Sequence, residues 1–221
     1  MTDVALSHAV SALDTESPRR YFRRFLGEHA PRASDLGWYF DQALPRVGEN
    51  DEVHLAVEEL VDQVGRFLEF EVTRDDESRH AVWSSKTGHQ LLVWAVETAA
   101  ALAEMGQATR ARDERLTSEH VTRWTDVSCL LVVCGRQNQR LLSDAIVLRR
   151  VGDRVRLCTV DGIRALADLH ERGLVGHDDV LTVLRPASPF ADPLVALIER
   201  HAGEAGASGH GDAAQQPEDR R

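Results

Sequence analysis

Histidines and carboxylates around residue 80 are the first candidates for chemistry in this sequence. His80 could serve as a metal ligand or as a general acid or base, with His54, His89 or Glu97 as its partner. Such a site requires side chains that share one face. We expect His80 to lie opposite Trp94 on paired strands, whereas His89 falls near the turn between them. Glu97 is expected on the other face. We therefore interpret His80 as a packed, hydrogen-bonded residue and keep the histidine site as an alternative.

Lysine chemistry has a single candidate. Lys86 is the one lysine in the chain, although lysine and arginine together number 26. Any mechanism that needs a catalytic lysine must therefore use Lys86. The residue lies in the polar sequence Ser-Ser-Lys-Thr-Gly, which is typical of a tight turn.

The three cysteines, Cys129, Cys134 and Cys158, lie in apolar runs that read as strands. Their number is odd, and Cys129 and Cys134 would point to opposite faces of one strand. Neither has a partner at the spacing of a metal site. We interpret all three as reduced thiols in the core.

Residues 79–98 read as two apolar strands joined by the turn around Lys86, with Gly88 available for a positive φ. Side chains alternate along a strand, so the hairpin has two defined faces. One face is expected to carry His80, Val82, Leu92, Trp94 and Val96. The other is expected to carry Ala81, Trp83, Leu91, Val93, Ala95 and Glu97. Because both faces are mainly apolar, the hairpin should belong to a sheet covered by helices on both sides.

The remaining elements follow from periodicity. A helix is predicted to begin near Pro18, and its arginines and aromatics at 19–25 are interpreted as a solvated and a packed side, with nucleic-acid contact as the alternative. Apolar residues at intervals of three and four predict a helix over 52–68. We expect a helix at 98–104 that Met105 and Gly106 interrupt. Two further helices are expected, one that begins after an N-cap at Asp161 and one over 193–201. Strands are expected at 70–72, 127–133, 145–148 and 154–160.

These elements predict three regions. Residues 1–50 form a flexible lead and a helical segment, and residues 51–201 form one α/β domain with a mixed sheet between helices. Residues 202–221 are rich in glycine, alanine and charge and are expected to be a disordered tail.

The element order resembles the PD-(D/E)xK superfamily, and in particular its Mrr-type members. The resemblance rests on Val-Glu-Glu-Leu at 57–60, His-Ala-Val-Trp at 80–83 and Val-Trp-Ala-Val-Glu-Thr at 93–98, and it extends over residues 52–198. It implies a restriction-endonuclease-like fold, a three-layer α/β/α sandwich with a central mixed sheet, here with added N-terminal helices.

Nucleases of this superfamily hold Mg²⁺ with an aspartate and a glutamate on adjacent strands, and a lysine follows two residues later. The resemblance aligns these positions with His80, Trp94 and Val96, which we therefore regard as degenerate catalytic positions. An indole and an isopropyl group cannot bind Mg²⁺, so no metal or other cofactor is expected. Glu58 or Glu59 could be a residual helix carboxylate, with a solvent-facing glutamate as the alternative.

The resemblance and the lost motif together predict a pseudonuclease that works by binding, as a protein-interaction or regulatory subunit, with a defence or mobile-element system as one setting. Its partner would be another protein or a second copy of the chain. The first alternative is a nucleic-acid-binding protein that uses the former nuclease cleft, through Arg136, Arg149, Arg150 and Arg154. The second is a divergent Mg-dependent DNA endonuclease, for which enzyme activity would have to be restored by a migrated carboxylate.

Composition agrees with a globular chain and disfavours two classes of partner. Of 221 residues, 43% are hydrophobic and 28% charged, and the net charge is −10. A negative surface binds nucleic-acid phosphates poorly outside local basic patches. The longest uncharged apolar run, near 90–96, is too short for a membrane span, and the N-terminus lacks a signal-like pattern. The sequence therefore predicts a cytoplasmic protein without a membrane partner.

Overall fold

The computed structural model describes residues 17–75, 78–117, 126–134, 139–186 and 190–208. The α-helices in this part of the chain are α2 (Pro18–His29), α3 (Leu36–Ala43), α4 (Asp51–Phe67), α5 (Thr98–Thr117), α6 (Gln139–Arg149), α7 (Val160–Glu171), α8 (His177–Leu184) and α9 (Asp192–Ser208). The strands are β1 (Glu71–Thr73), β2 (Ala81–Ser84), β3 (Gln90–Glu97), β4 (Val127–Cys134) and β5 (Val155–Thr159). Short 3₁₀ turns at Ala33–Asp35 and Leu44–Arg46 flank α3.

The strands form one mixed sheet in the order β1-β2-β3-β4-β5. β1, β2 and β3 pair antiparallel, and β3, β4 and β5 pair parallel. The parallel connections are made through helices, as parallel strands require. The predicted α/β class with a mixed sheet is confirmed.

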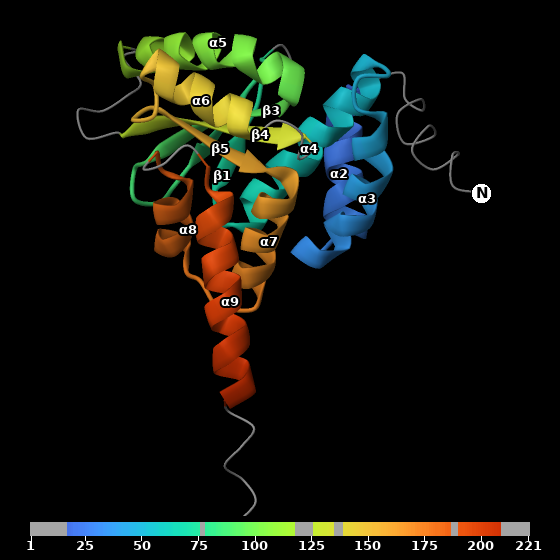
Figure 1. The fold of residues 1–221 in the computed structure, drawn as a ribbon. Coiled ribbons are helices and arrows are strands. Elements are labelled where there is room, and N and C mark those ends of the chain that lie inside the picture. Colours follow the sequence, from blue (N-terminus) through green and yellow to red (C-terminus); the bar gives the residue numbers. More distant parts are fainter. Residues whose placement is uncertain (1–16, 76–77, 118–125, 135–138, 187–189, 209–221) are drawn as a thin grey trace, which may run out of the picture.

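Helices cover both faces of this sheet (Figure 1). Trp94 and Val96 of β3 face α5 and α6, where they pack with Met105 and Ile146. Trp83 and the opposite face of β3 belong to a larger core that includes α4, α7 and the N-terminal helices. The sheet is therefore the middle layer of three, which explains why its strands are apolar on both faces.

The central hairpin has the predicted register. Ala81 pairs with Val93 and Val82 with Leu92, so that His80 continues opposite Trp94. The rings of His80 and Trp94 stack with their centroids 4.7 Å apart. Gly88 has the positive φ, 87°, that was expected in the turn.

One element and two helix ends differ from the sequence-based prediction. Residues 145–148 belong to helix α6 instead of a strand, because Leu142 and Ile146, four apart, are buried on one side of a helix. α5 continues through Met105 and Gly106, since Met105 packs into the core. α9 continues past Ala202 to Ser208, so the first part of the predicted tail is helical.

Helix α7 also begins earlier than expected. Its N-cap is Thr159 and not Asp161, because the Thr159 hydroxyl accepts a hydrogen bond from the Gly162 amide at 2.9 Å. Asp161 lies in the first turn, where a negative charge is still favourable.

The cysteines lie where the sequence predicts. Cys129 and Cys158 are fully buried, and Cys134 is partly buried. Burial raises the pKa of Cys129 and of Cys134 to about 12. Burial also raises the pKa of Cys158 well above its ordinary value, so all three are protonated thiols at neutral pH.

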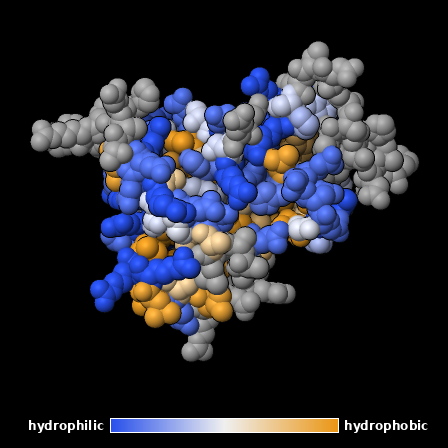
Figure 2. Space-filling model, turned by 90° about the horizontal axis from the view of Figure 1, so that it is seen from above, coloured by the Kyte–Doolittle hydropathy of each residue, from blue (hydrophilic) through white to orange (hydrophobic). Residues whose placement is uncertain are grey.

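Apolar side chains come to the surface on α6. Leu141, Val147 and Leu148 are 48%, 65% and 82% exposed. Figure 2 shows that apolar side chains also gather near the lower edge of the molecule in that view. In the described part of the chain, no helix has both the length and the apolar character that a bilayer span demands.

Close packing between α4 and β2 generates a first prediction. A Cβ atom on Gly65 would lie 2.5 Å from the Trp83 ring. Because Trp83 is fully buried, neither element can move away cheaply. We expect Gly65→Ala to lower the free energy of unfolding by about 1–3 kcal/mol, measured by urea denaturation.

Gly27→Ala is the matched control, because Gly27 is also helical and a Cβ there would meet no atom within 4 Å. That change should leave stability equal or raise it by about 0.5–1 kcal/mol. Equal effects of the two substitutions would contradict the proposed contact.

Candidate functional site

Helix α4 carries three buried carboxylates. The helix begins where the Asn50 side chain accepts a hydrogen bond from the Val53 amide. α4 then passes between the sheet and the N-terminal helices, so that Glu58, Glu59 and Asp62 are 3%, 1% and 0% exposed. Buried carboxylates are costly unless cations or donors compensate them. The solvent-facing alternative for Glu58 and Glu59 is therefore wrong.

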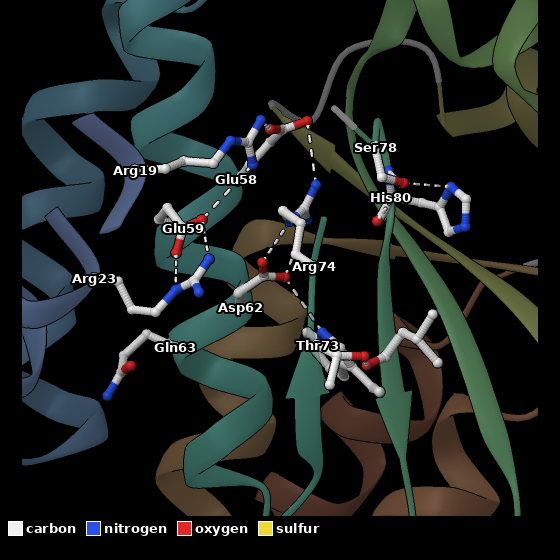
Figure 3. A network of polar contacts seen from close by, with 12 residues as sticks. Arg19, Arg23, Glu58, Glu59, Asp62, Gln63, Thr73, Arg74, Ser78 and His80 are labelled. Carbon is white, nitrogen blue, oxygen red and sulfur yellow. Dashed lines mark hydrogen bonds and ion pairs between the residues drawn. The ribbon is translucent and has the colours of Figure 1, made fainter. Parts of the chain in front are cut away.

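Arginines of α2 pair with two of these carboxylates (Figure 3). Arg19 donates to Glu58 at 2.6 Å. Arg23 makes two hydrogen bonds to Glu59, of 2.9 and 2.8 Å, which is the bidentate geometry of a strong pair. The side chains predicted as a solvated arginine face thus include two that anchor α2 on α4.

Arg74, just after β1, compensates the third carboxylate. Its guanidinium donates to both oxygens of Asp62, at 2.6 and 3.0 Å, and its Nη1 lies 3.5 Å from Glu58. The Arg74 side chain is completely buried. The Trp83 indole also donates to Asp62, at 3.4 Å. Arg74 therefore joins α4 to the loop that enters the hairpin.

His54 connects this network to the surface. Its Nε2 lies 3.5 Å from Glu58 Oε1. The contact with Glu58 raises the pKa of His54 and outweighs the opposing effect of burial. Burial raises the pKa of Glu58, but His54, Arg74 and Arg19 together leave it lowered. Glu58 is therefore held as a carboxylate.

His80, Trp94 and Val96, the positions that the resemblance aligns with a catalytic motif, lie together at the end of the hairpin away from its turn. His80 stacks on Trp94 and its Nδ1 is 3.2 Å from the Ser78 hydroxyl, as expected of a packed histidine. Trp94 and Val96 are each 3% exposed and belong to the core beneath α5. Burial and nearby arginine charges lower the pKa of His80.

A cleft of about 530 Å³ lies beside these positions. Its walls come from α2 and α4, from the chain entering β2, from the end of β3 and from α5. The lining residues are Arg19, Asp51, His54, Leu55, Glu58, Ser78, Arg79, Trp94, Ala95, Val96, Glu97 and Glu104. Sequence reasoning missed Asp51 and Glu104, since nothing in their local patterns distinguishes them from ordinary helix carboxylates.

The donor set does not fit the Mg²⁺ site that the superfamily resemblance implies. Trp94 and Val96 offer no oxygen, and Glu58 already contacts Arg19 and Arg74. Within the described residues, no three histidine, cysteine, aspartate or glutamate side chains are grouped so that they could hold a metal ion. Lys86 is at the far end of the hairpin, where its Nζ donates a hydrogen bond to Glu69 Oε2 at 3.2 Å.

The predicted nucleic-acid contacts lie elsewhere. Arg149 and Arg150 are exposed at the end of α6, and Arg154, near them in the chain, is 3.7 Å from both Asp113 and Asp153. None of these three arginines lines the cleft. Arg136 lies outside the described residues.

The alternative histidine site is only partly assembled. His54 meets Glu58, and Glu97 lines the same cleft, but His89 lies at the opposite end of β3. There His89 Nε2 is 2.9 Å from the Ser128 hydroxyl, and its Nδ1 is 3.3 Å from Asp126. A serine hydrogen-bonded to a histidine that in turn contacts an aspartate is also the arrangement of hydrolytic triads. Ser128 and His89, however, are only 4% and 6% exposed. We interpret the contact as structural.

Comparisons of the chain with protein-family models, curated proteins and solved structures gave no match.

The buried network predicts a large cost for removing Arg74. Arg74→Met keeps most of the aliphatic volume but leaves Asp62 and Glu58 without this cation. We expect a loss of about 3–5 kcal/mol in the free energy of unfolding, measured by urea denaturation at pH 7.5.

Arg172→Met is the control, because the Arg172–Asp168 pair is about half exposed on both sides and should contribute little. If the two substitutions cost the same, Arg74 does not compensate the buried carboxylates.

His89 predicts a pH dependence of stability. Burial lowers the pKa of His89, so the unfolded chain binds this proton more readily than the folded chain does. Stability should therefore fall as the pH drops through about 6.5, the unperturbed histidine pKa.

The measurement compares unfolding free energies at pH 8 and pH 5.5 for the natural chain and for His89→Gln, which cannot titrate. We expect a smaller acid-induced loss in the variant. An equal or larger loss in the variant would refute this role of His89.

Proposed function

We propose that this chain is a catalytically degenerate relative of restriction-endonuclease-like proteins, which acts by binding as a protein-interaction or regulatory subunit. The proposal rests on the side chains found at the positions that the resemblance aligns with a catalytic motif. An indole and a valine fill the core where metal ligands would project, and arginines compensate the helix carboxylates.

The fold supports this proposal in its element order. An amphipathic helix, an antiparallel three-strand unit, a helix and a parallel strand follow one another in α4, β1, β2, β3, α5 and β4. The superfamily resemblance leads us to expect this order. The proposal that the domain is restriction-endonuclease-like rests on that agreement and on the residues at 57–60, 80–83 and 93–98.

The cleft chemistry favours a protein partner over nucleic acid. Four carboxylates line the cleft, whereas its two arginines both contact glutamates. Such a surface repels phosphates. The exposed apolar side chains of α6 offer additional contact area of the kind found at protein interfaces.

Nucleic-acid binding remains the second candidate, favoured by the exposed Arg149 and Arg150 outside the cleft. This candidate is tested by retention on immobilised duplex and single-stranded DNA. The salt concentration should be about 20–50 mM, at which screening is weak and surface charges still attract phosphates. We expect no retention. Retention that weakens steeply with salt and is lost in Arg149→Ala/Arg150→Ala would favour this candidate instead.

The absence of catalysis is tested with supercoiled plasmid and single-stranded DNA in the presence of Mg²⁺ or Mn²⁺. We expect the substrates to remain intact, because neither an indole nor an arginine-paired carboxylate can organise the metal and water. Glu58→Gln and Glu97→Gln are the diagnostic variants. Cleavage by the natural chain that either substitution abolishes would overturn the proposal and identify a divergent endonuclease.

A further inference from the structure

The edge of β3 is open along the cleft. β2 pairs with β3 only as far as Ala81 opposite Val93, whereas β3 continues to Glu97. The backbone amide of Gln90 donates toward the β4 side, to the Asp126 carbonyl at 2.8 Å. Because backbone groups alternate along a strand, those of Ala95 and Glu97 point toward the β2 side. No described strand pairs with them there.

The cleft runs along this open edge. Four consecutive residues, 94–97, line it, although their side chains alternate between two faces of the sheet. Residues from both faces line one cleft where the cleft borders the edge of the strand near its carboxyl end. Unpaired strand edges bind extended peptides by adding a strand.

The side chains around the edge have an excess of negative charge. Asp51, Glu58, Glu97 and Glu104 line the cleft. Arg19 is committed to Glu58, and the mostly exposed Arg79 contacts Glu104 Oε1 at 3.3 Å. The described contacts of Asp51 and Glu97 include no arginine.

Glu104 provides an independent sign of a missing donor. Its side chain is 13% exposed, and its Oε2 is a buried oxygen with no hydrogen-bond partner among the described residues. Buried carboxylate oxygens normally accept hydrogen bonds. The described side chains therefore use only part of the hydrogen-bonding capacity of the Glu104 carboxylate.

We propose that the cleft binds an extended segment of a partner protein, which adds to the β3 edge at Ala95 and Glu97 and places an arginine or lysine between Glu97 and Glu104. This inference rests on the proposed protein-interaction function and specifies its surface. The open edge from Trp94 to Glu97 is about 10 Å long at roughly 3.3 Å per residue. It therefore accommodates a strand of about three or four residues.

Nuclear magnetic resonance titration of the full, ¹⁵N-labelled chain tests the proposal. The probe is the blocked pentapeptide Val-Arg-Val-Arg-Val, and the comparison peptides carry glutamate in place of arginine or methyl groups on the backbone nitrogens. We expect the arginine peptide to shift the amide signals of Ala95 and Glu97. The glutamate and N-methylated peptides should bind at least tenfold more weakly.

Glu97→Gln/Glu104→Gln should weaken binding of the arginine peptide at least tenfold while leaving the rest of the spectrum unchanged. Glu69→Gln is the matched control, because Glu69 also pairs with an exposed cation but lies near the hairpin turn, and it should have no effect. Absence of shifts at millimolar peptide, or equal binding by the double variant, would overturn the proposal.

The outcome separates this proposal from the broader one. Peptide-induced shifts confined to α6 would refute the cleft as the docking site and leave the protein-interaction function standing. Plasmid cleavage in the nuclease assay would refute the function itself.

Discussion

The pairing of arginines with the buried carboxylates of α4 is the interaction on which the arrangement of this molecule depends. A helix that carries three carboxylates can pass through the interior only if cations accompany it. α2 supplies two of these cations, and the loop after β1 supplies Arg74. The same contacts hold the N-terminal helices against the domain and fix the chain that leads into the hairpin.

This compensation also determines the chemistry of the neighbouring cleft. Arg19 and Arg74 use their charge on α4, so they do not make the cleft positive. Carboxylates at the end of β3 and on α5 then dominate the surface. The α/β domain thus presents a cleft whose negative charge is unsuited to nucleic-acid phosphates.

Local patterns predicted the hairpin, its register and the long helix α4, because alternation and helical periodicity are properties of neighbouring residues. They could not predict the ion pairs, since Arg19 and Glu58 are 39 positions apart. The strand expected at 145–148 failed because a short apolar run suits a strand or a buried helix face equally. Because side chains alternate along a strand, Glu97 and Trp94 were correctly predicted to lie on opposite faces. Both nevertheless line the cleft, because the cleft follows the strand edge. No described strand pairs with that edge, because β2 begins at Ala81, a boundary that the apolar pattern does not define.

The position of Lys86 has a practical consequence for how the molecule can be joined to others. It bears the one side-chain amine of the chain, is 79% exposed and lies at the tip of the hairpin. The cleft borders the other end of β3, which at about 3.3 Å per residue is roughly 23 Å away. An acylating reagent or a lysine-directed modifier that acts on side chains would therefore attach at one defined point. The protein would then be tethered with its cleft facing away from the point of attachment.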